Sequence, residues 1–79
     1  MANLNKLKKE RELEVYQAYL AILIQEKICG IMEEKDISQR ELAKRAGLGE
    51  AAVSRLLSDD RNLTLKTVGR VFHALGEKV

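Results

Sequence analysis

The side chains in this sequence that are best suited to binding another molecule are basic, and several gather in the stretch from 38 to 57. Arg40, Lys44, Arg45 and Arg55 lie there. A guanidinium presents N–H donors in a rigid fork and an ammonium is a compact point charge, so both bind anions and carbonyl acceptors. Two short helical patterns on either side of a glycine carry these residues on their outer faces. We interpret the stretch as a frame that holds one helix against a partner.

Side chains for catalysis are too few to form an active site. The sequence has one histidine, His73, one cysteine, Cys29, and no glycine-rich phosphate loop. Nucleophilic catalysis needs a nucleophile beside a base, and a closed zinc site needs several ligands. We therefore expect no enzyme, no metal and no cofactor. His73 is interpreted as a surface or packing residue and Cys29 as part of the core.

Length and composition favour one small helical domain. The chain has 79 residues, of which 46% are apolar and 4% aromatic, and it contains no proline. A domain of this size has a small, simple core. The formal net charge of +2 gives little attraction for a polyanion. Basic residues nevertheless exceed acidic ones by four to two over 1–12 and by eight to five over 38–79, whereas 13–37 has two basic and five acidic residues.

No segment of the sequence predicts membrane insertion or secretion. The longest apolar run, from Tyr19 to Ile24, is far shorter than a membrane-spanning helix. No basic stretch followed by an apolar segment and a cleavage site opens the chain. We expect a soluble cytoplasmic protein that associates with the nucleoid.

A first helix is predicted from about residue 10 to 34, after a flexible basic N-terminus over 1–9. Its core-facing residues recur at steps of three and four. A second apolar set, Val15, Tyr19 and Ile22, falls outside that stripe. A helix that is apolar on more than one side is either deeply buried or covered by a partner chain. The predicted core-facing residues are Leu13, Tyr16, Leu20, Leu23 or Ile24, Ile28 and Ile31.

Three shorter helices complete an all-α fold, and each is bounded by residues that start or stop helices. Ser38 followed by Glu41 is a capping box, and Gly47 suits the left-handed turn after a helix. Thr64 caps the last helix and Gly76 ends it. We thus predict a single domain over 10–79 with four helices, at about 10–34, 39–46, 50–57 and 65–75. Four residues of the last helix are expected to face inward: Leu65, Val68, Phe72 and Leu75.

The spacing within 38–57 is that of a helix-turn-helix, in which the second of two short helices is presented to the major groove of DNA. Small Ala43 allows the second helix to cross the first, and Gly47 makes the turn. Val53 and Leu56 are placed to fix the second helix in the core. An ordinary helical hairpin in a small bundle is the alternative.

Two short patterns cover this motif. Q-x-E-L-A-x-x-x-G runs from Gln39 to Gly47 and V-S-x-x-L from Val53 to Leu57, with T-L-K-T-V and H-A-L-G behind them. They resemble the lambda-repressor-like (Cro-type, XRE) family of helix-turn-helix transcriptional regulators. The pattern N-L-T-L-K-T-V-x-x-V-x-x-A-L-G is also similar to the antitoxin branch of that family, which represses its own toxin–antitoxin operon. The resemblance implies a small lambda-repressor-like domain that binds DNA sequence-specifically, expected here to be a repressor.

The resemblance also implies roles for individual residues when the helix 50–57 enters the major groove. Arg55 is expected to pair with guanine O6 and N7, and Ala51 to touch a thymine methyl group. Ser54, on the same face, is expected to contact a base or the backbone. The expected base contacts are Glu50, Ala51, Ser54 and Arg55, and the expected phosphate contacts are Gln39, Arg40, Lys44, Arg61 and Asn62.

Some of these positions allow a second interpretation. Glu50 stands where an uncharged polar reader is common, so it either accepts a hydrogen bond from cytosine N4 or only stabilises the N-terminus of its helix. Arg40, Lys44 and Arg45 suit a solvated face as well as phosphate contact. Asp59 and Asp60 repel a phosphate backbone, so their loop either turns them outward or docks weakly.

Double-stranded DNA and a second copy of the chain are the expected partners. One short recognition helix offers too little contact for tight specific binding, and a dimer would read a palindromic operator with half-sites about one helical turn apart. Val15, Tyr19 and Ile22 form the candidate dimer surface, with a deeper intramolecular groove as the alternative. The rival function is an antitoxin or adaptor that occludes a protein partner such as a toxin and uses the helix-turn-helix for autoregulation.

Overall fold

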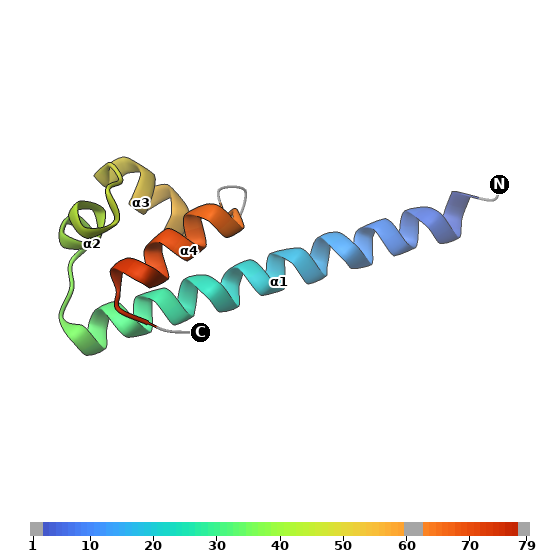
Figure 1. Ribbon diagram of the computed structural model, residues 1–79. Coiled ribbons are helices and arrows are strands. Elements are labelled where there is room, and N and C mark those ends of the chain that lie inside the picture. Colours follow the sequence, from blue (N-terminus) through green and yellow to red (C-terminus); the bar gives the residue numbers. More distant parts are fainter. Residues whose placement is uncertain (1–2, 60–62, 78–79) are drawn as a thin grey trace.

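One helix of this protein is much longer than the other three. The computed structural model describes residues 3–59 and 63–77, and these ranges contain no strand. The helices are α1 (Asn3–Lys35), α2 (Gln39–Ala46), α3 (Glu50–Ser58) and α4 (Leu65–Ala74). Figure 1 shows α2, α3 and α4 gathered beside the C-terminal half of α1, whose N-terminal half projects away from them. The predicted all-α, four-helix fold with an extended first helix is confirmed.

Two parts of the structure can be separated by their packing. We call α2, α3 and α4, together with residues 21–37, the head, and we call residues 3–20 of α1 the arm. The principal extents of 52 × 21 × 18 Å reflect the projection of the arm from the head.

The first helix begins at Asn3 rather than near residue 10 as predicted. Residues 3–9 contain no glycine or proline and consist largely of leucine and lysine, which are good helix formers. Adding turns to an existing helix is much cheaper than nucleating a new one. The basic tail predicted over 1–9 is therefore helical from residue 3, and the division of the chain at residue 10 stays a prediction.

Burial in α1 starts only at Ala21, which is 5% exposed. The predicted core stripe is therefore wrong for the preceding turns. At 1.5 Å per residue the 33 residues of α1 extend over about 50 Å, whereas α2, α3 and α4 have only 8, 9 and 10 residues and cannot cover it. Three residues predicted to face the core are exposed at 55%, 61% and 42%, namely Leu13, Tyr16 and Leu20, whereas of the alternatives Leu23 and Ile24 it is Ile24 that packs against the core.

The C-terminus of α1 is a left-handed turn made without glycine. Asp36 has φ 55°, a conformation that a short polar side chain tolerates better than a branched one. The N–H groups of Asp36 and Ile37 donate to the carbonyls of Glu33 and Met32 at 3.2 and 2.8 Å, the pattern of a Schellman motif. Ile37 closes this turn against the core, with 7% of its surface exposed.

The ends of α2 lie where the capping residues predict them. Ser38 Oγ accepts a hydrogen bond from the N–H of Glu41 at 3.1 Å, one half of the capping box. The Glu41 carboxylate accepts from Arg45 Nε at 3.0 Å, one turn along the helix. Gly47 follows with φ 68°, where a side chain would be strained. The direction in which the chain leaves α2 is thus set by Gly47.

One apolar core joins all four helices of the head. Two polar contacts also fasten α1 to its neighbours: Gln25 Nε2 donates to the carbonyl of Leu56 at 3.0 Å, and Lys35 Nζ donates to the carbonyl of Leu75. Both acceptors lie in the last turn or C-cap of a helix, where carbonyls lack an intrahelical donor. The largest fully buried side chains are Ile28, Leu42, Val53, Leu56, Val71 and Leu75.

The last helix has its predicted caps but a different buried face. Thr64 caps its N-terminus through the hydroxyl, and Gly76 follows its end with φ 78°. Leu75 is 2% exposed and Phe72 packs against the core, as predicted, whereas Val71, which was not predicted to face inward, is 0% exposed. Leu65 was predicted to face inward but is 91% exposed, because it lies about a quarter of a turn away from the face that Val71 and Leu75 define.

Candidate nucleic-acid interface

The helix-turn-helix is assembled as its spacing predicts. Leu42, Ala43 and Ala46 turn one face of α2 into the core. Ala43 is 3% exposed, and α2 packs against both α3 and α4. On α3, Val53 and Leu56 are 0% and 1% exposed. With its inner face fixed by these two side chains, α3 presents the opposite face to solvent.

The outer face of α3 brings together all four predicted base contacts. Glu50, Ala51, Ser54 and Arg55 are exposed, and they lie at i, i+1, i+4 and i+5, which is one side of a helix. Ser58 is exposed one turn further on, and its hydroxyl donates to the carbonyl of Ser54 at 2.8 Å. The resulting surface carries a carboxylate at one end, a guanidinium one and a half turns later, and small side chains between and beside them.

Arg55 also borders a shallow hollow between α3 and α4. The hollow has a volume of about 210 Å³ and is lined by Leu48, Ala52, Arg55, Leu56 and Thr67. Ala52 is exposed here, as is Arg55. Small residues at this point leave space around the guanidinium. The patterns of the sequence gave no reason to single out Ala52 or Thr67.

The three described phosphate candidates lie on the exposed surface of α2. Gln39 is the first residue of the helix, where N–H groups lack intrahelical partners and the helix dipole is positive. Arg40 and Lys44 are exposed and one turn apart, so they share one flank. Arg45 is held on the next flank by its ion pair with Glu41 at 3.0 Å. Arg61 and Asn62 lie outside the described residues.

Arg70 has a structural contact that the sequence did not predict. Its Nη1 donates to the carbonyl of Ala46 at 3.3 Å, and a cation at a helix C-terminus is favourable. The same nitrogen would lie 3.4 Å from a Cβ placed on Gly47. Arg70 therefore ties α4 to the turn of the motif. Because these two residues are 24 positions apart in the sequence, no local sequence pattern predicts their contact.

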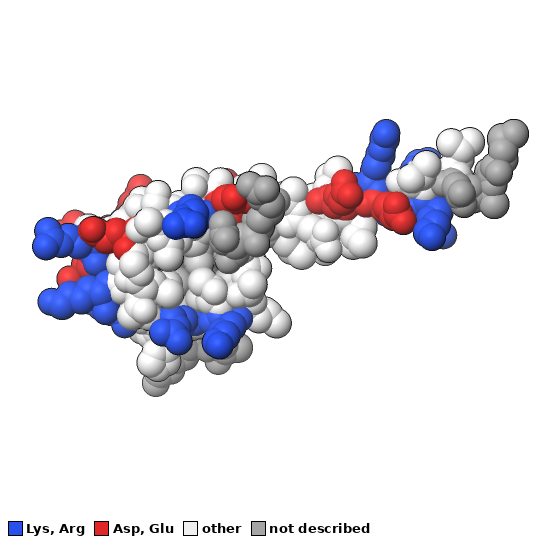
Figure 2. All heavy atoms as spheres, turned by 90° about the horizontal axis from the view of Figure 1, so that it is seen from above, with Lys and Arg blue, Asp and Glu red and all other residues white. Residues whose placement is uncertain are grey.

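Charge on the head is mixed rather than uniformly positive. Figure 2 looks down on α2 and α3, and it shows Lys and Arg side chains spaced around the head with acidic side chains near some of them. Asp59 lies at the C-cap of α3, whereas Asp60 lies outside the described residues. The head could therefore attract phosphates locally, through a few basic side chains, while long-range attraction stays weak.

The single histidine and the single cysteine do not belong to a metal-binding cluster in the part of the chain that the structure describes. His73 and Cys29 are both exposed, so the prediction that Cys29 belongs to the core is wrong. Cys29 lies beside the buried row of Ile28 and Ile31 but off that face. Within residues 3–59 and 63–77, no group of three or more His, Cys, Asp or Glu is arranged to hold a metal ion. None of the helices in these ranges is both long and apolar enough to cross a membrane.

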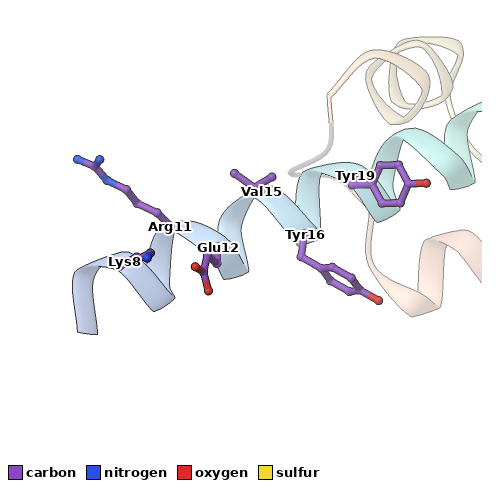
Figure 3. Close-up of a pocket in the computed structure, with 6 residues that line it drawn as sticks. All are labelled: Lys8, Arg11, Glu12, Val15, Tyr16 and Tyr19. Atoms are coloured by element: carbon purple, nitrogen blue, oxygen red, sulfur yellow. The ribbon is translucent and has the colours of Figure 1, made fainter. Parts of the chain in front are cut away.

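The candidate dimer residues project from α1 into open space. Val15, Tyr19 and Ile22 are 70%, 57% and 51% exposed, so the intramolecular groove considered from the sequence does not form in the described structure. Val15 and Tyr19 line an open surface hollow of about 450 Å³. Figure 3 shows its lining residues all standing on this one helix. The complete lining is Lys8, Arg11, Glu12, Val15, Tyr16 and Tyr19.

Comparison with known proteins agrees with the geometry of α2 and α3. The helix-turn-helix family model (HTH_3) matches residues 31–79, which include α2, α3 and α4 with the last turn of α1. Neither the curated proteins nor the solved structures gave a match. The matched region covers more than half of the chain and leaves out residues 1–30. The chain belongs to the lambda-repressor-like (XRE) helix-turn-helix family of DNA-binding transcription regulators.

Proposed function

We propose that this protein is a sequence-specific repressor that places α3 in the major groove of its operator. One observation carries the proposal. The inner face of α3 is packed in the core through Val53 and Leu56, which are 0% and 1% exposed, while its polar outer face is exposed to solvent. A rigid helix with one free face is what the major groove accommodates. The experiment that tests the proposal is a gel shift with the DNA upstream of the protein's own gene.

Within this surface, Arg55 is the main base reader. Its guanidinium stands on the exposed face of α3 and can donate two parallel hydrogen bonds to guanine O6 and N7. Ala51 contacts a thymine methyl group, and Ser54 contacts a base edge or the adjacent backbone. Glu50 is assigned to cytosine N4, and an unchanged base preference in Glu50→Ala would assign it instead to the N-terminus of α3.

Contacts to phosphates set the register of α3 on the duplex. Gln39 is placed for this role because it begins α2, where free N–H groups and its side-chain amide can bind one phosphate together. Arg40 and Lys44 flank that end as exposed cations. Arg45 contributes less, since its guanidinium is already paired with Glu41. Arg61 and Asn62 are proposed as further backbone contacts on sequence grounds alone.

The repressor acts as a homodimer at DNA in the cytoplasm, in association with the nucleoid. One α3 helix has 9 residues, and a single short module buries too little surface for the affinity of a typical operator complex. Val15, Tyr19 and Ile22 supply an exposed apolar surface for the second copy. Two copies would read a palindrome, and occupation of the promoter by the dimer would block transcription.

An antitoxin or adaptor is the second candidate function. It is favoured by the position of the exposed apolar residues, because Val15, Tyr19 and Ile22 precede the family-matched region 31–79. In this alternative the arm occludes a protein partner and the head provides autoregulation. A small toxic protein encoded beside this gene, which co-purifies with the intact chain but not with a Tyr19→Glu variant, would support the alternative. Its absence would leave the repressor as the better assignment.

A further inference from the structure

A continuous seam runs along the face of α1 that is turned away from the head. Its members follow one another at alternating steps of four and three residues, the spacing of a coiled-coil contact line. The apolar members Val15, Tyr19 and Ile22 are 70%, 57% and 51% exposed. The charged members Lys8, Glu12 and Glu26 are exposed as well. In order, the seam consists of Lys8, Glu12, Val15, Tyr19, Ile22 and Glu26.

We propose that the seam pairs with the same seam of a second copy in antiparallel orientation. The proposal rests on the homodimer proposed above and specifies how its two chains meet. Because the steps of four, three, four, three and four are the same in both directions, the seam can be reversed onto itself without loss of register. In the fully overlapped arrangement Val15 of each copy packs against Tyr19 of the other, and Lys8 lies opposite Glu26.

Charge distinguishes this arrangement from a parallel one. In a parallel, in-register pair every seam residue meets its own counterpart, so Lys8 would face Lys8, Glu12 would face Glu12 and Glu26 would face Glu26. Like charges opposite one another are unfavourable and help to exclude an alternative pairing. Antiparallel pairing replaces these repulsions with two symmetry-related Lys8–Glu26 pairs at the ends of the contact. It also places Glu12 of each copy opposite Ile22 of the other, and this pair of a charged and an apolar side chain is the least complementary in the seam.

The head leaves the whole seam accessible to a partner. The residues through which α1 packs on the three short helices, among them Ala21, Ile28 and Met32, lie on the opposite side of α1 from Tyr19. Tyr16 and Leu23 flank the seam and are 61% and 42% exposed, so they widen the apolar surface. A second helix can therefore lie along residues 8–26 without displacing α2, α3 or α4.

The proposed register also fixes the offset of the two heads along the axis of the paired helices. The midpoint of the seam is residue 17, and Ile28, which is fully buried, marks the centre of the head on α1. At 1.5 Å per residue the two copies of Ile28 are about 33 Å apart along the paired helices. The three short helices of each copy pack on the face of α1 opposite the seam, so the two heads also lie on opposite sides of the helix pair and their full separation is larger than this axial offset.

Disulfide trapping tests the orientation directly. Cys29 is first changed to Ser so that no native thiol interferes. In this background a tagged Val15→Cys chain is mixed with an untagged Tyr19→Cys chain and oxidised mildly. The antiparallel seam predicts that most of the disulfide-linked product is the mixed dimer of tagged and untagged chains. A parallel seam predicts that each variant links mainly to itself, which would overturn the proposal.

Charge reversal tests the register. Lys8→Glu and Glu26→Lys should each weaken dimerisation in analytical ultracentrifugation on the order of tenfold at low salt, and the double variant should recover most of the wild-type affinity. Additive losses in the double variant would contradict the Lys8–Glu26 pairs. A wild-type dimer that gives no mixed disulfide would refute the orientation alone and leave the homodimer standing. A wild-type protein that stays monomeric at tens of micromolar would refute both the homodimer and the antiparallel seam. The same holds if the monomer binds lipid vesicles or another protein.

Discussion

At the residue scale, the proposed DNA contacts separate into those that read sequence and those that only hold position. Arg55 stands on the open face of α3 and is proposed to contact a base, whereas Gln39 at the start of α2 is proposed to contact only the backbone. The two residues therefore predict different outcomes when each is truncated. The contrast between them tests the docking of the motif better than either variant alone.

Arg55→Ala should weaken binding to the specific operator by about 1 to 3 kcal/mol and relax discrimination at one base pair. The reason is the loss of a bidentate pair with guanine, which leaves the remaining contacts in place. Fluorescence anisotropy against operators substituted at each position measures both effects. Lys27→Ala, which removes an exposed positive charge from α1, is the matched control and should bind as the wild type does. An unchanged base preference in Arg55→Ala would remove Arg55 from the base contacts.

Gln39→Ala should weaken binding to specific and unrelated DNA by the same factor, about 0.5 to 1.5 kcal/mol for one uncharged hydrogen bond. A lost phosphate contact carries no sequence information, so the ratio of the two affinities should stay constant. The measurement is a pair of titrations at one salt concentration. A selective loss on the operator would show that Gln39 reads a base instead.

At the element scale, the structure shows which features are local and which depend on the whole chain. The ends of α2 and both caps of α4 follow from the chemistry of Ser38, Gly47, Thr64 and Gly76, and these predictions are confirmed. The direction of the chain between α2 and α3 is set by Gly47, and Ser38 stabilises the start of α2. A weakened cap should therefore lower stability without removing any group that touches DNA.

Ser38→Ala should lower the free energy of unfolding by about 1 kcal/mol, because the N–H of Glu41 loses its acceptor at the N-terminus of α2. Urea denaturation followed by circular dichroism measures the change. Ser38→Asp is the matched control, since a carboxylate caps equally well and should restore the stability. If Ser38→Ala unfolds at the wild-type urea concentration, the cap does not contribute to the stability of the head.

The failures of prediction at this scale have one physical cause. Periodicity reveals that a helix has an apolar stripe, but it does not reveal whether another part of the chain is present to cover it. Tyr16 and Leu20 fit the stripe of α1 and are exposed, because the three short helices end before reaching them. Leu65 fits the spacing of α4 and is also exposed, since Val71 shifts the buried face. Likewise, the contact of Arg70 with Ala46 joins distant segments and has no local signature.

At the scale of the whole molecule, the arm is the feature that a helix-turn-helix alone does not explain. It precedes the family-matched residues 31–79 and keeps large apolar side chains in solvent. A surface of this kind on a small protein marks an interaction site. The candidate DNA contacts follow from the motif, whereas the role of Val15, Tyr19 and Ile22 stays a prediction that depends on a second molecule.

Tyr19→Glu should convert the proposed dimer into a monomer, because it places a charge at the centre of the apolar surface. Sedimentation velocity should show the change, and operator affinity should fall by about 100-fold or more because the two DNA-binding heads are no longer linked. Leu65→Glu is the matched control, since Leu65 is an apolar residue 91% exposed on α4 rather than on the arm. Both variants should retain the helical content of the wild type. A Tyr19→Glu protein that sediments as a dimer would rule out this surface.

The most direct test of the central claim is a gel shift of the purified protein with the DNA upstream of its own gene, beside a shuffled sequence of equal composition. A sequence-specific regulator should bind the upstream DNA about 1,000-fold more tightly at physiological salt. The preference should survive an excess of unrelated competitor DNA. No retardation of this DNA at low salt, or equal affinity for both sequences, would contradict the claim that α3 reads an operator there.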